Sequence, residues 1–197
     1  MEITARRSAH LAALLLIVTV VTQIAYVVMS DAGIDFSRAF VWSTEAAAFL
    51  GISVFALVAL ARSNGHSAAW AAIAVGGTLN VVQVGMGLAM FAPLKEAGDA
   101  MAPAFQAVLG GAFFLYYAGK FSFGFAAIVI GMAALRGGSA AVKGFGGLAV
   151  LSGLVAMLIN LGAMAGYELM FQAGAAGTAA TLLLALAIIW ASQSDAV

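Results

Sequence analysis

The chain has 197 residues, of which 64% are hydrophobic and only 8% are charged, with 8 basic residues balancing 8 acidic ones. Soluble domains usually carry about 25% charged residues, so this composition excludes an ordinary water-soluble domain and indicates a membrane protein. The sequence contains no cysteine, which excludes disulfides, thiolate metal sites, iron–sulfur clusters and thiol catalysis. The balanced charge also argues against nucleic acid as a partner.

Apolar segments of about 20 residues recur along the whole chain, and each can cross a hydrocarbon core of roughly 30 Å as a helix. Little sequence remains between them, so we expect one all-α domain over residues 1–197, a polytopic bundle whose first partner is the lipid bilayer. The 23 glycines favour close packing of its helices through small residues. The six predicted spans are residues 9–30, 40–61, 68–91, 112–135, 143–165 and 173–192.

The first apolar segment follows Arg6 and Arg7, a start that resembles a secretory signal. Its apolar part is too long for such a signal, and it lacks a clear cleavage site of small residues. We therefore expect this segment to be retained as the first helix of the bundle.

Residues 92–111 are the hardest part of the chain to place. An unbroken helix over residues 103–135 would be about 50 Å long and would exceed the membrane thickness. Either the part before Gly110 and Gly111 lies along the interface, or a turn at residues 119–120 hides a seventh span. The second alternative leaves two spans of about 15 residues, below the usual minimum of roughly 17. We keep six spans and predict a bend at Gly110 and Gly111.

The basic residues predict the orientation of the bundle, because Lys and Arg concentrate in cytoplasmic loops. Only Arg38 and Lys95 lie outside if the N-terminus is cytoplasmic, while Lys120 falls within a span. The five basic residues inside are then Arg6, Arg7, Arg62, Arg136 and Lys143. We therefore expect both termini in the cytoplasm and the protein in a bacterial inner membrane. The tryptophans lie near predicted helix ends, as interfacial aromatic residues do: Trp42, Trp70 and Trp190.

The sequence carries no nucleotide loop, zinc-protease helix, catalytic triad or dinucleotide fingerprint at a usable spacing. Both histidines, His10 and His66, map to the cytoplasmic edge of the predicted bundle. A transmembrane haem would instead need axial ligands that face each other inside the bundle. The sequence therefore predicts no catalytic residue, no metal site and no cofactor, and it disfavours an enzyme.

Polar residues inside the predicted spans are the most informative feature of the chain. With the predicted topology, nearly all of them lie between the midplane and the outer surface, and the inner half is almost purely apolar. Their spacing places each set on one face of its helix. Because polar groups avoid lipid, we expect these faces to turn inward and meet. The candidate ligand-binding residues are Gln23, Tyr26, Glu45, Asn80, Gln83, Tyr116, Tyr117, Lys120 and Asn160.

Lys120 and Glu45 stand out, because a charge near the bilayer centre costs about 2.5–3.5 kcal/mol on insertion scales. The two residues lie at similar predicted depths, so they could pair with each other or handle a ligand or a proton. Alternatively, Glu45 is hydrated near the surface and Lys120 extends outward along its aliphatic stem. We predict that Lys120 faces the interior, beside at least one member of a polar set: Glu45, Tyr26, Asn80, Gln83 and Asn160.

Two functions from different classes are compatible with this pattern. In the first, an outward-facing polar pocket binds or transports a small amphipathic or anionic ligand, with Lys120 as the charge anchor. In the second, the bundle is a non-catalytic accessory subunit that assembles with other membrane subunits. The six-helix plan with both ends inside, together with Ala9 and Ala13, resembles the substrate-binding subunits of energy-coupling-factor vitamin transporters. That resemblance implies a ligand site near the outer side of the membrane.

Overall fold

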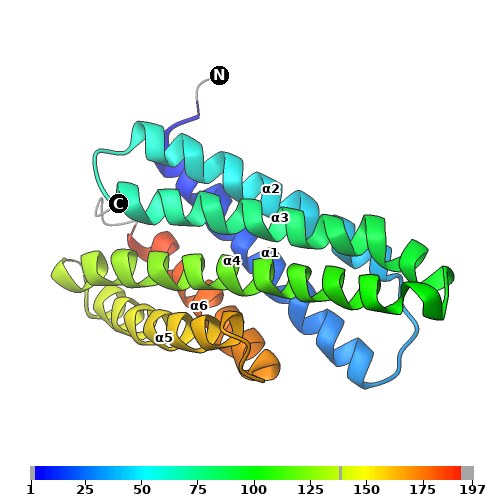
Figure 1. Ribbon diagram of the computed structural model, residues 1–197. Helices are drawn as coiled ribbons and strands as arrows, with labels where there is room; N and C mark the ends of the chain where they lie inside the picture. Colours follow the sequence, from blue (N-terminus) through cyan, green and yellow to red (C-terminus); the bar gives the residue numbers. More distant parts are fainter. Residues whose placement is uncertain (1–2, 138, 192–197) are drawn as a thin grey trace.

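The computed structural model describes residues 3–137 and 139–191, and this part of the chain is a bundle of six long helices (Figure 1). All six are long and apolar enough to cross a membrane, which confirms the six-span prediction. The helices are α1 (Ala5–Asp31), α2 (Arg38–Arg62), α3 (Ser67–Glu96), α4 (Ala102–Arg136), α5 (Ala140–Met164) and α6 (Met170–Ala191), with a short 3-10 helix, η1 (Asp99–Met101), before α4.

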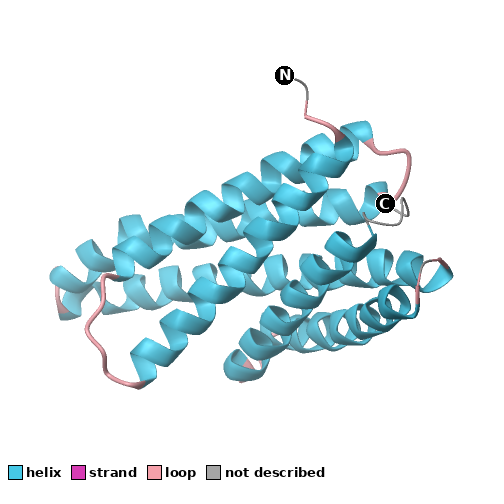
Figure 2. Ribbon diagram, turned by 180° about the vertical axis from the view of Figure 1, so that it is seen from behind, coloured by secondary structure: helices cyan, strands magenta, loops and turns pink. Residues whose placement is uncertain are grey.

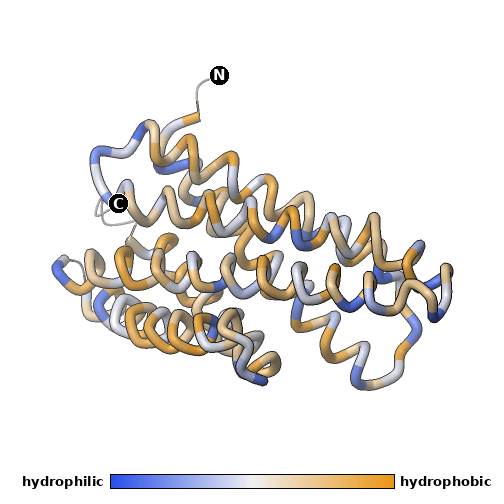
Figure 3. Tube along the Cα trace, in the orientation of Figure 1, coloured by the Kyte–Doolittle hydropathy of each residue, from blue (hydrophilic) through white to orange (hydrophobic). Residues whose placement is uncertain are grey.

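Consecutive helices run in opposite directions, so the start of α1 and the end of α6 lie at the same end of the bundle (Figures 1 and 2). We call this the inner end, and we call the opposite end, with the α1–α2, α3–α4 and α5–α6 loops, the outer end. Each helix packs against the next one in the chain, and α6 also packs against α1 and α4. Hydrophilic residues gather mainly in the loops and at the helix ends, while the stretches between are mostly apolar (Figure 3).

All three loops at the outer end turn on a glycine with a positive φ angle. These are Gly33 (φ 65°), Gly98 (φ 76°) and Gly166 (φ 91°). Residues with a Cβ atom rarely adopt this backbone region, so glycine is the residue that ends each helix sharply and lets the chain return. The starts of α1, α2 and α5 are capped by side chains, as where Thr4 accepts a hydrogen bond from the backbone N–H of Arg7 at 3.2 Å.

α4 is a single helix of 35 residues, so the predicted bend at Gly110 and Gly111 is wrong. Glycine lowers helix propensity by about 1 kcal/mol but keeps its backbone N–H, and a backbone in an apolar phase must satisfy its own hydrogen bonds. At the usual rise α4 is roughly 52 Å long, which exceeds a hydrocarbon core of roughly 30 Å. α3 has 30 residues, and the α3–α4 pair projects past the other helices at the outer end (Figure 1).

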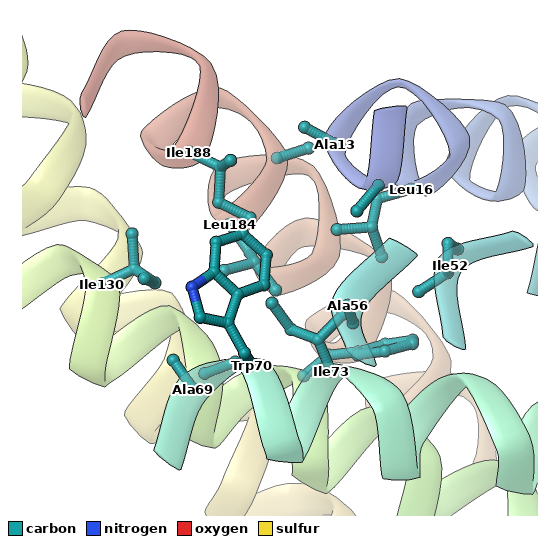
Figure 4. Packing of buried hydrophobic residues seen from close by; sticks show 14 of the residues in the cluster. Ala13, Leu16, Ile52, Ala56, Ala69, Trp70, Ile73, Ile130, Leu184 and Ile188 are labelled. Carbon is teal, nitrogen blue, oxygen red and sulfur yellow. The ribbon is translucent and has the colours of Figure 1, made fainter. Parts of the chain in front are cut away.

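The inner half of the bundle is filled by buried apolar side chains from all six helices, and Trp70 lies among them (Figure 4). Trp70 is only 1% exposed, so the prediction that it is an interfacial anchor is wrong. The first turn of α3 directs its indole ring into the bundle, where it lies beside Ile130, Leu184 and Ile188 (Figure 4). This close-packed core leaves the outer half as the part of the bundle where polar side chains are placed.

Candidate functional site

α1 and α4 are held apart in this bundle, and polar side chains bridge the space between them in its outer half. Nowhere in the described chain do Cα atoms of these two helices come within 8 Å of each other. Gln23 of α1 nevertheless contacts both Tyr116 and Lys120 of α4. Only long side chains can make such contacts, so the candidate site is built across a gap rather than at a tight helix interface.

Lys120 lies in the middle of this arrangement and is completely buried, with 0% of its surface exposed. Its Nζ donates a hydrogen bond of 2.9 Å to Oε1 of Gln23 and lies 5.4 Å from the centre of the Tyr116 ring. The prediction that Lys120 faces the interior is confirmed, and the alternative in which its stem leads outward is wrong. Its acceptor is Gln23, whereas Glu45 attracts it electrostatically without direct contact.

Gly177 of α6 makes the room for the lysine stem. A Cβ atom at this position would lie 2.8 Å from both Cβ and Cγ of Lys120. Contacts this short are essentially excluded, so a residue with a side chain here would push α6 away from α4. The position of the Lys120 side chain therefore depends on the close approach of α6, which only a glycine at position 177 permits.

Gln23 joins Lys120 to Tyr116, because its Nε2 donates to the Tyr116 hydroxyl while its Oε1 accepts from the ammonium group. The side chain of Thr178 of α6 lies beside the same hydroxyl. Its Oγ1 is buried and forms no hydrogen bond of proper geometry with the described residues. Among the described residues the Tyr116 hydroxyl is the one polar group beside Thr178, and the two hydroxyls together keep at least one O–H donor for a further acceptor.

Glu45 of α2 is half-buried and bonds to α1 rather than to Lys120. Its Oε1 accepts a hydrogen bond of 3.1 Å from Oγ1 of Thr22, the residue before Gln23. The direct ion pair between Glu45 and Lys120 that the sequence allowed is not formed. Each charged group is instead bonded to a neutral side chain of α1, Glu45 to Thr22 and Lys120 to Gln23.

Asn80 and Asn160 are both completely buried, and both are helix-packing residues in this structure. Each donates from Nδ2 to the carbonyl oxygen one turn earlier at 2.8 Å, and Asn160 also reaches the carbonyl of Ala173 at 3.4 Å. Asn80 lies against Gly119, the residue before Lys120. The Oδ1 atoms of both asparagines are buried without a partner among the described residues, and neither side chain bonds to Lys120.

Aromatic rings form a row across the outer end, above the polar group. The row runs over α1, α2, α3 and α4 through Tyr26, Trp42, Phe91 and Phe105, with centroid distances of 6.1, 5.9 and 5.5 Å. Tyr26 therefore belongs to this row rather than to the hydrogen-bonded group.

The two remaining candidates lie outside the hydrogen-bonded group as well. Tyr117 is 8% exposed and packs on Tyr116 and Phe113. Gln83 is half-buried and takes no part in the hydrogen bonds of the described residues.

Sequence reasoning missed Thr22, Thr178 and Gly177. A threonine inside a span gives no distinct signal, because its hydroxyl is commonly satisfied by a carbonyl of its own helix. The one available clue was position, since Thr22 precedes Gln23. Gly177 is one of 23 glycines, and only the helix that faces it shows which of them adjoin a functional side chain.

Two hollows on the described surface are lined by other residues than the candidates. A groove of about 500 Å³ lies between α1 and α2, against Leu15, Val18 and Phe40. A smaller one of about 300 Å³ lies at the α1–α2 loop, near Asp35 and Arg38. The predicted open pocket is not one of these, because the polar side chains bond to one another. Within the described residues, no cluster of three or more His, Asp or Glu could hold a metal.

The fold and the composition thus define an α-helical integral membrane protein with a buried polar group near its outer end. Comparison with protein families, curated proteins and solved structures found no match. The functional argument therefore depends on the chemistry of the residues around Lys120.

Proposed function

We propose that the protein binds or transports a small ligand in the outer half of its bundle, with Lys120 as the charged group of the site. The observation that carries this proposal is that a completely buried ammonium group has a neutral amide as its hydrogen-bond partner. A charge inside the membrane is costly, and a purely structural lysine is expected to contact a carboxylate directly. Among the described residues, Glu45 is the one carboxylate that acts on Lys120, and it is bonded to Thr22 instead.

The packing of the two halves supports access from the outer end. The inner half is closed by a continuous apolar core that includes Trp70, Phe123 and Leu184, each at most 1% exposed. In the outer half, the Cα atoms of α1 and α4 stay more than 8 Å apart. Side chains alone bridge the space between these helices, and side chains can rotate. A ligand can therefore displace side chains near Lys120 without separating the helices of the core.

Native mass spectrometry of the full chain, purified in a mild detergent, tests this proposal. We expect a small molecule of defined mass with the wild-type protein, retained by Lys95→Met and lost from Lys120→Met. Lys95 is a matched control, because its Nζ lies over the Phe105 ring at the outer end, 5.2 Å from the ring centre and away from Gln23. Tyr116→Phe is a second site variant, which keeps the bond between Lys120 and Gln23.

The melting temperature of each variant is measured alongside, so that loss of the small molecule is not confused with loss of folding. Retention of the same small molecule by Lys120→Met and Tyr116→Phe would contradict the proposal. A stoichiometric protein partner in place of a small molecule would also contradict it, and would favour an accessory subunit of a larger membrane complex.

A further inference from the structure

The carboxamide of Gln23 holds a position with an unusual combination of neighbours. One of its polar atoms, Oε1, faces the ammonium group of Lys120, and the other, Nε2, faces the Tyr116 hydroxyl. A carboxamide and a carboxylate have the same planar shape, with two polar atoms on one carbon. A carboxylate in this position would present an acceptor to both neighbours, and the bond to the ammonium group would become charge-assisted and stronger.

The groups around this position offer more donors than the protein uses. An ammonium group has three N–H donors, and Gln23 is the one hydrogen-bond acceptor of Lys120 in the described chain. The Tyr116 hydroxyl accepts from Gln23 and lies beside the Thr178 hydroxyl, with which it can share one hydrogen bond. Two hydroxyls that bond to each other use one O–H donor, so this pair keeps a second one, and Thr178 is buried with no other partner among the described residues. The site therefore combines a positive charge with unused donors, which an anionic acceptor would satisfy.

We propose that the ligand carries a carboxylate bound by Lys120, Tyr116 and Thr178, and that Gln23 is its internal competitor. The inference rests on the proposed function. In the ligand-free protein, the amide of Gln23 fills the carboxylate position and limits the cost of the buried ammonium group. When the ligand arrives, Gln23 rotates away and the ligand carboxylate takes its place. A glutamate at position 23 would close the site permanently with an internal ion pair, whereas the neutral amide can be displaced.

Aromatic side chains next to the site indicate the chemistry of the part of the ligand that lies away from its carboxylate. Tyr26 lies one helical turn outward from Gln23 on α1, and Trp42 lies one turn outward from Glu45 on α2. Their rings are 6.1 Å apart and lie on the side of the site that faces the outer end. An apolar tail attached to the carboxylate would pack against these rings, so the substrate class is a small amphipathic monocarboxylate.

Isothermal titration calorimetry of the full chain in detergent, with three six-carbon probes, tests the ligand class. The probes are hexanoate, its neutral analogue hexanamide and its cationic analogue hexylammonium. We expect hexanoate to bind about ten- to a hundredfold more tightly than the other two, because only it gains charge-assisted bonds to Lys120. Equal or tighter binding of hexanamide or hexylammonium would overturn the carboxylate assignment.

Three variants test the roles of the residues. Gln23→Ala removes the competitor and is expected to bind hexanoate several-fold more tightly than the wild-type protein. Gln23→Glu supplies an internal carboxylate and is expected to lose hexanoate binding. Thr178→Val should weaken binding several-fold with little change in the melting temperature, because Tyr116 is the one described neighbour of this hydroxyl and keeps its bond from Gln23. Gln106→Ala, which removes an exposed amide of α4, is the control and should bind like the wild-type protein.

The outcomes separate this inference from the proposed function. Unchanged hexanoate affinity in Gln23→Glu would overturn the competitor role, and unchanged affinity in Thr178→Val would overturn the donor set. If no probe binds to the wild-type protein or to Gln23→Ala, the carboxylate proposal is wrong. A small molecule that still co-purifies in a Lys120-dependent manner would then leave the proposed function standing with a different ligand class.

Discussion

Gly119→Ala is expected to destabilise the bundle through a clash with Asn80. Gly119 of α4 faces this asparagine of α3, and a Cβ atom there would lie 2.0 Å from Nδ2 and 3.0 Å from Cγ of Asn80. Asn80 has 0% exposure, and its Nδ2 donates to the carbonyl of Gly76 at 2.8 Å. The substitution therefore forces the amide to leave its acceptor or forces α3 and α4 apart.

The size of the effect follows from three terms. Overpacking a well-packed interior costs about 1–3 kcal/mol. A buried donor that loses its acceptor costs about 1–3 kcal/mol more. Alanine in place of glycine within a helix returns about 0.5–1 kcal/mol. We therefore expect Gly119→Ala to lower the free energy of unfolding by about 1–5 kcal/mol.

Unfolding of the purified protein in mixed micelles, titrated with a denaturing detergent, measures this loss. Asn80→Ala removes the clashing amide. The nearest atom to the new Cβ at position 119 is then the carbonyl oxygen of Gly76, at 3.1 Å. The double variant should therefore be more stable than the sum of the single effects, by about 0.5–3 kcal/mol. Gly85→Ala is the control, because a Cβ atom at Gly85 meets nothing within 4 Å.

We expect Gly85→Ala to be as stable as the wild-type protein or more stable by about 0.5–1 kcal/mol. If Gly119→Ala behaves like Gly85→Ala, or if Asn80→Ala gives no coupling, the described contact between α3 and α4 is wrong.

Two further predictions concern the charges and the orientation. Lys120→Met should be less stable than the double variant Lys120→Met with Glu45→Gln, by about 0.5–3 kcal/mol in the same unfolding assay. The single change leaves the charge of Glu45 in a poor solvent without its counter-charge. Equal stabilities would show that the two charges are not coupled. Cysteines placed singly at Gly33 or Gly98 should be labelled by an impermeant thiol reagent from the side opposite to a cysteine at Gly65, and labelling of all three from one side would contradict the six-span topology.

The number of spans could be predicted from the sequence, because the bilayer imposes one length and allows only helices that satisfy their own backbone hydrogen bonds. The interior position of Lys120 was predictable for a related reason, since an ammonium group on a lipid-facing surface would have no acceptor. Both predictions concern the contact of a single helix with lipid, and the residues of that helix alone determine this contact.

The partners of Lys120 depend on which helix stands opposite α4 and at what distance. Spacing along one helix defines a face but does not identify the residue across from it. The bond from Lys120 to Gln23, and the place of Thr178 beside Tyr116, could be identified only with α1 and α6 in place. The same holds for Trp70, which lies at a helix end in the sequence but in the core of the bundle. Tertiary structure decided these features because the contacts join segments far apart in the chain. The distance between two such helices depends on how the whole bundle packs.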